Sequence, residues 1–153
     1  MIQNTLQQDL KESLSKLETA LLTPVISGEL ESWIQAIRQA ATELGEHLKR
    51  YTEVVLRKEY KEIAKSDQEL LFRVEQMAAD DAALKTEYEQ FQNELNNLAL
   101  RVPRGERDEG KSAEHQARVE KLGTALVLHI KRHQVAVATW LSEAVYRDRG
   151  PVD

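Results

Sequence analysis

Residues 6–21 read LQQDLKESLSKLETAL, and this stretch decides the fold class. Its leucines recur every three or four residues, which places them on one face of a helix. The same period continues in three later segments. Their apolar positions are Trp33, Ile37, Ala40, Ala41, Leu44, Leu48, Tyr51 and Val55; then Leu70, Val74, Met77, Leu84, Tyr88, Phe91 and Leu95; then Val119, Leu122, Leu126, Ile130, Val137, Trp140, Leu141 and Ala144. Four amphipathic helices are therefore expected.

Helix-breaking residues separate these segments. Thr23-Pro24 ends the first, because the residue before a proline avoids the helical region. Residues 66–69 resemble a helix cap, residues 103–110 form a polar run, and residues 149–151 stop the last helix. We expect an all-α, up-down-up-down antiparallel four-helix bundle. It forms a single domain over residues 1–153, with a long polar loop at residues 101–111 and a C-terminal tail at residues 149–153.

Composition excludes several classes of function. The net charge of -5 argues against a nucleic-acid partner, which would require a basic face. The chain has no cysteine, so disulfides, thiolate catalysis and iron–sulfur clusters are excluded. No stretch approaches the ~20 apolar residues of a membrane span, and the N-terminus lacks the pattern of a signal peptide. We expect no membrane partner and a cytoplasmic location, whereas a protein partner or a homodimer stays open.

Three polar residues occupy positions where the helical pattern predicts burial in an apolar core. Asp81 and His133 fall inside apolar stripes, and His47 falls at the edge of one. A buried carboxylate costs several kcal/mol unless it is paired, protonated or bound to a cation. If the helices are antiparallel, Asp81 lies level with Tyr51, about one turn from His47, and opposite a residue two positions from His133. The three side chains are therefore expected to share one layer.

Two interpretations of this layer remain open. One is a structural ion pair between Asp81 and imidazolium. The other is a single Fe or Zn ion bound by His47, Asp81 and His133, a two-histidine-one-carboxylate set. Tyr51, Glu53 and Asp80 are the residues available to orient these ligands. Asp80 is expected to point to the side, His129 to face the rim or solvent, and His115 to be a capping or surface residue.

Several strings, in this order, resemble the hemerythrin-like (HHE cation-binding) family of four-helix bundles over roughly residues 30–150. WIQAIR at residues 33–38 and LGEH at residues 44–47 are similar to that family's second helix. FRVEQMAADD at residues 72–81 is similar to its third helix. His133, WLSEA at residues 140–144 and the tail at residues 146–150 are similar to its last helix and terminus.

The resemblance implies a di-iron centre, and most of its ligands are replaced here. His47 and His133 match family histidines, but Asp81 stands at a histidine position, and Tyr51 and Val137 stand where carboxylates are expected. The expected function is that of a hemerythrin-like protein that has lost the di-iron centre. It would be a non-enzymatic interaction or sensory module with no cofactor. The alternative is a single-ion oxygen or redox sensor. Acid–base catalysis by Asp81 and His133 is the least favoured option, because no nucleophile or oxyanion hole is evident.

Overall fold

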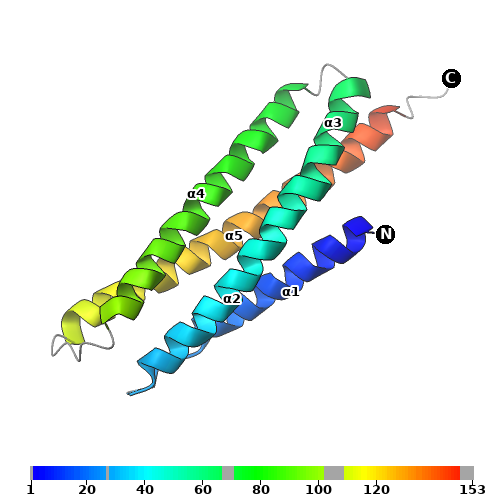
Figure 1. Ribbon diagram of the computed structural model, residues 1–153. Coiled ribbons are helices and arrows are strands. Elements are labelled where there is room, and N and C mark those ends of the chain that lie inside the picture. Colours follow the sequence, from blue (N-terminus) through cyan, green and yellow to red (C-terminus); the bar gives the residue numbers. More distant parts are fainter. Residues whose placement is uncertain (1, 27, 67–70, 102–108, 149–153) are drawn as a thin grey trace.

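The computed structural model describes residues 2–26, 28–66, 71–101 and 109–148, and every regular element in these ranges is a helix (Figure 1). In chain order the elements are α1 (Ile2–Leu22), α2 (Leu30–Arg50), the π-helix η1 (Tyr51–Leu56), α3 (Arg57–Ser66), α4 (Leu71–Arg101) and α5 (Glu109–Asp148). The all-α prediction is confirmed. In the same ranges, no helix combines the length and apolarity that crossing a membrane requires.

The helices α2, η1 and α3 follow one another without a break. Arg50 and Arg57, which flank η1, both have right-handed helical dihedral angles. Figure 1 shows one long rod from the cyan to the green part of the chain. The main packing partners are α1 with α2 and α4 with α5, and smaller contacts join α1 to α5 and α2 to α4.

The predicted end of the first helix agrees with the structure, whereas both ends of the predicted long loop differ from it. α1 ends directly before Thr23-Pro24, and Gly28 then takes a positive φ of 87° that favours glycine. The predicted loop at residues 101–111 is shorter, because Arg101 belongs to α4 and residues 109–111 belong to α5. The predicted cap at residues 66–69 begins with Ser66, which is instead the last residue of α3. The rest of that cap, residues 102–108 and the tail at residues 149–153 lie outside the described residues.

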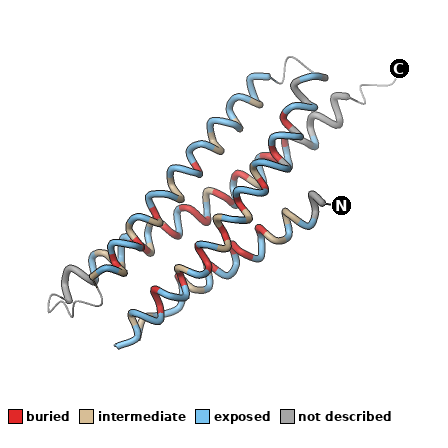
Figure 2. The backbone as a smooth tube through the Cα atoms, viewed as in Figure 1, coloured by how far each residue is buried: buried red, intermediate tan, exposed pale blue. Residues whose placement is uncertain are grey.

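A continuous apolar core runs between the helices (Figure 2). The leucines of the opening stretch are in it, since Leu10, Leu14 and Leu17 are at most 1% exposed. The other helices contribute the remaining members of the core. These include Trp33, Ile37, Leu44, Leu48, Leu84, Phe91, Leu95, Leu98, Val119, Leu126, Ile130, Val137 and Trp140. The helical period of the sequence thus identified the buried faces.

Glycine allows two close approaches between helices. A Cβ added at Gly123 on α5 would lie 2.8 Å from Leu21 Cδ1 and 2.9 Å from Phe91 Cε2, so α5 packs tightly on both α1 and α4. At Gly45 on α2, an added Cβ would lie 2.6 Å from Tyr88 Cζ. The Tyr88 hydroxyl donates a hydrogen bond of 2.9 Å to the Ala41 carbonyl and fixes α4 beside α2.

The π-helix shifts the buried face of the long rod by one residue. A regular helical period after Tyr51 predicts Val55 as the next buried position. The structure instead buries Leu56, at 1% exposed, and Tyr60, at 7% exposed, while the Val55 side chain lies outside the described residues. A π-helix contains one extra residue in a helical turn, so the stripe resumes one position later. This shift turns Tyr60 toward α4 and α5.

Candidate functional site

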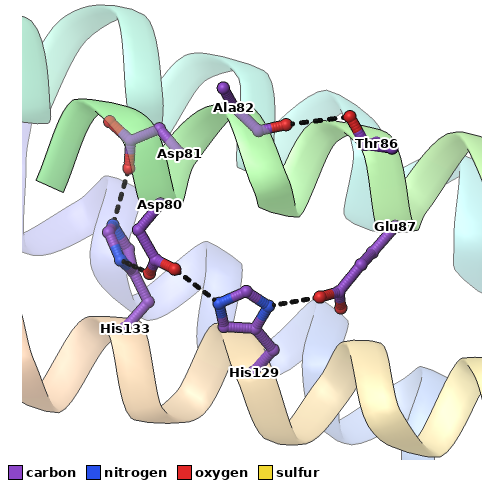
Figure 3. Close-up of polar contacts among 7 residues, drawn as sticks. All are labelled: Asp80, Asp81, Ala82, Thr86, Glu87, His129 and His133. Carbon is purple, nitrogen blue, oxygen red and sulfur yellow. Dashed lines mark hydrogen bonds and ion pairs between the residues drawn. The ribbon is translucent and has the colours of Figure 1, made fainter. Parts of the chain in front are cut away.

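Five charged side chains form a continuous chain of contacts between α4 and α5 (Figure 3). The order is Asp81, His133, Asp80, His129 and Glu87, which we call the His-carboxylate chain. The four contacts are Asp81 Oδ1 to His133 Nε2 at 2.7 Å, His133 Nδ1 to Asp80 Oδ2 at 2.6 Å, Asp80 Oδ1 to His129 Nε2 at 2.8 Å, and His129 Nδ1 to Glu87 Oε1 at 2.8 Å.

The His-carboxylate chain runs from the core to the surface. The His133 side chain is 2% exposed and that of Asp81 is 12% exposed. At the other end, the side chains of Asp80 and Glu87 are 37% and 38% exposed. The charges at the inner end therefore interact in a weakly screened environment, whereas those at the outer end are partly hydrated.

Each histidine of the chain lies between two carboxylates. Ionised carboxylates only accept hydrogen bonds, so a ring with a carboxylate at each nitrogen needs a proton on both nitrogens. His133 Nδ1 donates to Asp80 with good geometry. His133 Nε2 and Asp81 Oδ1 are close but not aligned as a hydrogen bond, so charge attraction holds this inner contact. Both rings are thus bound as imidazolium.

The pKa values agree with this charge state. Burial alone would lower the pKa of His133, but the close contacts with Asp81 and Asp80 and the negative charges of these carboxylates outweigh it and raise that pKa above its ordinary value. The pKa of His129 is likewise raised, because Asp80 and Glu87 outweigh burial. Burial would raise the pKa of Asp80, yet the two histidines lower it. The charged forms of these groups therefore favour one another.

A tyrosine from α3 adjoins the inner end of the chain. The Tyr60 ring packs edge-on against Trp140, with 5.8 Å between ring centroids. Burial and then the charge of Asp81 raise the pKa of the Tyr60 hydroxyl, which keeps it neutral. Because the π-helix sets the orientation of α3, Tyr60 reaches this position only through the one-residue shift described above.

The structure brings together two of the three residues expected to form a site. Asp81 and His133 are in contact, whereas His47 lies on α2 with a buried Nδ1 that has no hydrogen-bond partner. Tyr51 is buried at 2% exposed, and Glu53 is exposed on η1.

Two further residues take part in the site in ways that the helical projection did not predict. Asp80 does not point to the side but bridges His129 and His133, so it can orient the His133 ring as expected of it. His129 lies at the rim, with a side chain that is 25% exposed, and it also links Asp80 to Glu87. His115 is also half-buried and lies 3.4 Å from Glu94. The spacing contained a signal for the network: the histidines are four residues apart, and Asp80 and Glu87 are seven apart, so each pair repeats along one helix face.

The residues present do not fit a di-iron centre. Among residues 2–26, 28–66, 71–101 and 109–148, no three or more His, Asp or Glu side chains form a group that could hold a metal ion. Both ring nitrogens of His133 already face carboxylates, so neither offers a lone pair while the ring is imidazolium. The chemistry of the His-carboxylate chain is that of proton binding and charge pairing.

Comparison of the chain with protein-family models, with curated proteins and with solved structures found no match. The geometry of the His-carboxylate chain is therefore the basis of the function proposed next.

Proposed function

We propose that the protein is a non-enzymatic sensory or interaction module of the hemerythrin-like kind, without a di-iron centre. In this proposal α1, the rod α2–η1–α3, α4 and α5 form an up-down-up-down antiparallel bundle. The packing of α1 on α2, of α4 on α5 and of α1 on α5 supports this topology.

The observation that carries the proposal is the environment of His133. In a metal site, an imidazole nitrogen must be free of a proton to bind the ion. Here the two ring nitrogens lie 2.6 Å and 2.7 Å from the carboxylates of Asp80 and Asp81. Two imidazolium ions then supply the positive charge that iron would otherwise supply to buried carboxylates.

The same environment argues against acid–base catalysis. A general base needs a free lone pair within reach of a substrate proton. His133 has both nitrogens engaged and a side chain that is 2% exposed, so it meets neither requirement. A role in stability and in sensing conditions that alter the charges of the chain fits the geometry better.

Elemental analysis tests the proposal. The protein is purified without chelator, and iron and zinc are measured against protein concentration. We expect well below one metal ion per chain and no visible absorption band. Two irons per chain with an oxygen-sensitive band would contradict the proposal. His133→Gln is the matched variant, because it removes an imidazole that a metal centre would need and should leave the already low metal content unchanged.

A single Fe or Zn ion bound by His47, Asp81 and His133 is the second candidate, and it requires the three side chains to leave the described arrangement, in which they form no metal-holding group and His133 contacts Asp80 and Asp81. The observation in its favour is the buried Nδ1 of His47, which has no hydrogen-bond partner and would gain one from a ligand. Titration with Zn²⁺ and Fe²⁺ under anaerobic conditions tests it, with His47→Ala compared to His115→Ala. Stoichiometric binding that only the His47 variant loses would support this candidate, and equal binding by both variants would refute it.

A further inference from the structure

A cavity of about 500 Å³ lies between the rod α2–η1–α3 and α4. Its volume is within the range of about 300–1,000 Å³ that small-molecule sites occupy. Leu48, Leu84 and Tyr88 give it an apolar wall, and Leu48 and Leu84 are themselves core residues. A molecule placed there would contact the hydrophobic core on one side and reach water on the other.

Local features of the sequence keep this space open. Thr52 and Glu53 of η1 line the cavity, and π-helical turns are frequent at functional sites. Ala82 on α4 contributes only a methyl group to the lining. The Tyr88 ring packs over Gly45, and Gln92 and the Ala41 carbonyl hold its hydroxyl in place at 2.7 Å and 2.9 Å. The wall is therefore preorganised.

Asp81 connects the cavity to the His-carboxylate chain. Its Oδ1 is buried against His133, and its other carboxylate oxygen points away from that ring (Figure 3). The Asp81 side chain also lines the cavity, at 12% exposed. Tyr60 adjoins the same carboxylate from α3 but does not line the cavity. The cavity thus has a half-buried carboxylate beside an apolar wall.

Charge decides which ligand suits this acceptor. The other charged side chains that line the cavity, Lys49, Arg57, Lys85, Glu53 and Glu89, are all exposed and screened by water. Asp81 is the half-buried carboxylate of the lining, and only one of its two oxygens faces His133. An ammonium group could donate to the other oxygen, whereas an anion would be repelled by the carboxylate.

We propose that this cavity binds a small organic ammonium ion, with the ammonium group on Asp81 and an apolar body against Leu48, Leu84 and Tyr88. The proposal names a ligand for the sensory role proposed above and rests on that role. The measured metal content tests the proposed sensory role, whereas the binding of amines tests the proposed ligand. Either proposal can therefore be refuted without the other.

Binding of three matched probes tests the ligand proposal. The probes are 2-phenylethylamine, 2-phenylethanol and 3-phenylpropionate, and each is titrated into the full chain and followed by protein NMR. We expect the amine to bind about tenfold tighter than the alcohol, as one charge-assisted hydrogen bond would give, and the carboxylate to bind most weakly. Equal affinity of amine and alcohol, or no binding of the amine, would overturn the proposal.

Two variants locate the site. Asp81→Asn should remove the preference for the amine over the alcohol. Because Asp81→Asn also weakens the ion pair with His133 and thereby the fold, a second variant is needed. Ala82→Phe fills the cavity and leaves the residues of the His-carboxylate chain unchanged. Ala136→Phe, at an exposed position of α5 outside the cavity lining, is its control. Loss of amine binding in Ala82→Phe alone supports the site, and unchanged binding in that variant refutes it.

Discussion

At the scale of single residues, His133 is the group on which the polar layer depends. It is the most buried ion of the His-carboxylate chain and the only one that contacts both Asp80 and Asp81. Without it, Asp81 would keep only the neutral Tyr60 hydroxyl as a neighbour at the inner end of the chain. A buried charge that loses its partner is strongly destabilising, whereas the net value of an intact pair is small.

We therefore expect His133→Gln to lower the free energy of unfolding by about 3 kcal/mol, which is the low end of the range for breaking a buried pair. Urea unfolding followed by circular dichroism at pH 6 measures this change. His115→Gln is the control, because the His115–Glu94 contact is longer, at 3.4 Å, and its loss should cost below about 1 kcal/mol. Equal effects of the two substitutions would show that His133 is not held as an ion.

The histidines should also make stability depend on pH. The folded-state pKa values of His129 and His133 are raised above the ordinary 6.5. Their contribution is therefore fully present below about pH 6.5 and is lost as the pH rises through the raised values. Asp80 acts in the opposite sense: its pKa is lowered from 3.8, so its contribution is present above that pH and is lost as the pH falls. Maximum stability is expected between these limits.

Urea unfolding at intervals from pH 5 to pH 9 measures this dependence. The free energy of unfolding should fall above about pH 6.5 in the wild type and should change much less in the double variant His129→Gln/His133→Gln. His133 should account for most of the effect, because its side chain is 2% exposed and that of His129 is 25% exposed. A wild-type profile that is flat over this range would contradict the imidazolium assignment.

At the scale of elements, the π-helix η1 explains why part of the site escaped sequence analysis. The leucine period predicted the buried faces of α1 and α2, because burial follows a regular repeat as long as the helix is regular. After Tyr51 the repeat slips by one residue, and Leu56 and Tyr60 become buried. No local pattern marks that slip. The contacts of Asp80 with His129 and His133 were not predicted for a related reason, since projection on a helical wheel ignores how far a side chain reaches sideways between two packed helices.

Deleting Val54, which is 46% exposed, should convert η1 into a regular helix and keep both flanking faces in register. We expect the thermal midpoint to change by only a few degrees. Deleting Gln39, an exposed residue in the regular part of α2, is the control. It should rotate the halves of the rod by about 100° relative to each other and abolish cooperative unfolding. Thermal melts by circular dichroism distinguish the two, and equal damage would refute the one-residue slip.

At the scale of the whole molecule, the fold class is determined by many residues along the chain, whereas the site is determined by few. The all-α class follows from apolar positions repeated along the entire chain, so a local change of period such as that at η1 does not alter it. The site follows from a few contacts between α4 and α5. Levels estimated from loop positions brought Asp81 and His133 together, and the structure has these two side chains in contact at 2.7 Å. Such estimates are accurate to about a turn, which decides whether two charges touch.

Removal of metal ions tests whether a bound cation contributes to the stability of the whole molecule. A bound ion stabilises the folded state in proportion to the logarithm of its concentration over its dissociation constant, so its removal lowers the thermal midpoint. Here a continuous apolar core joins α1, α2, α4 and α5, and imidazolium ions neutralise the buried carboxylates internally. We expect prolonged dialysis against EDTA to leave the helix content and the thermal midpoint unchanged, within about 1 °C. A fall of several degrees that returns to the original value on adding Fe²⁺ or Zn²⁺ would show that a cation, rather than His133, balances Asp81.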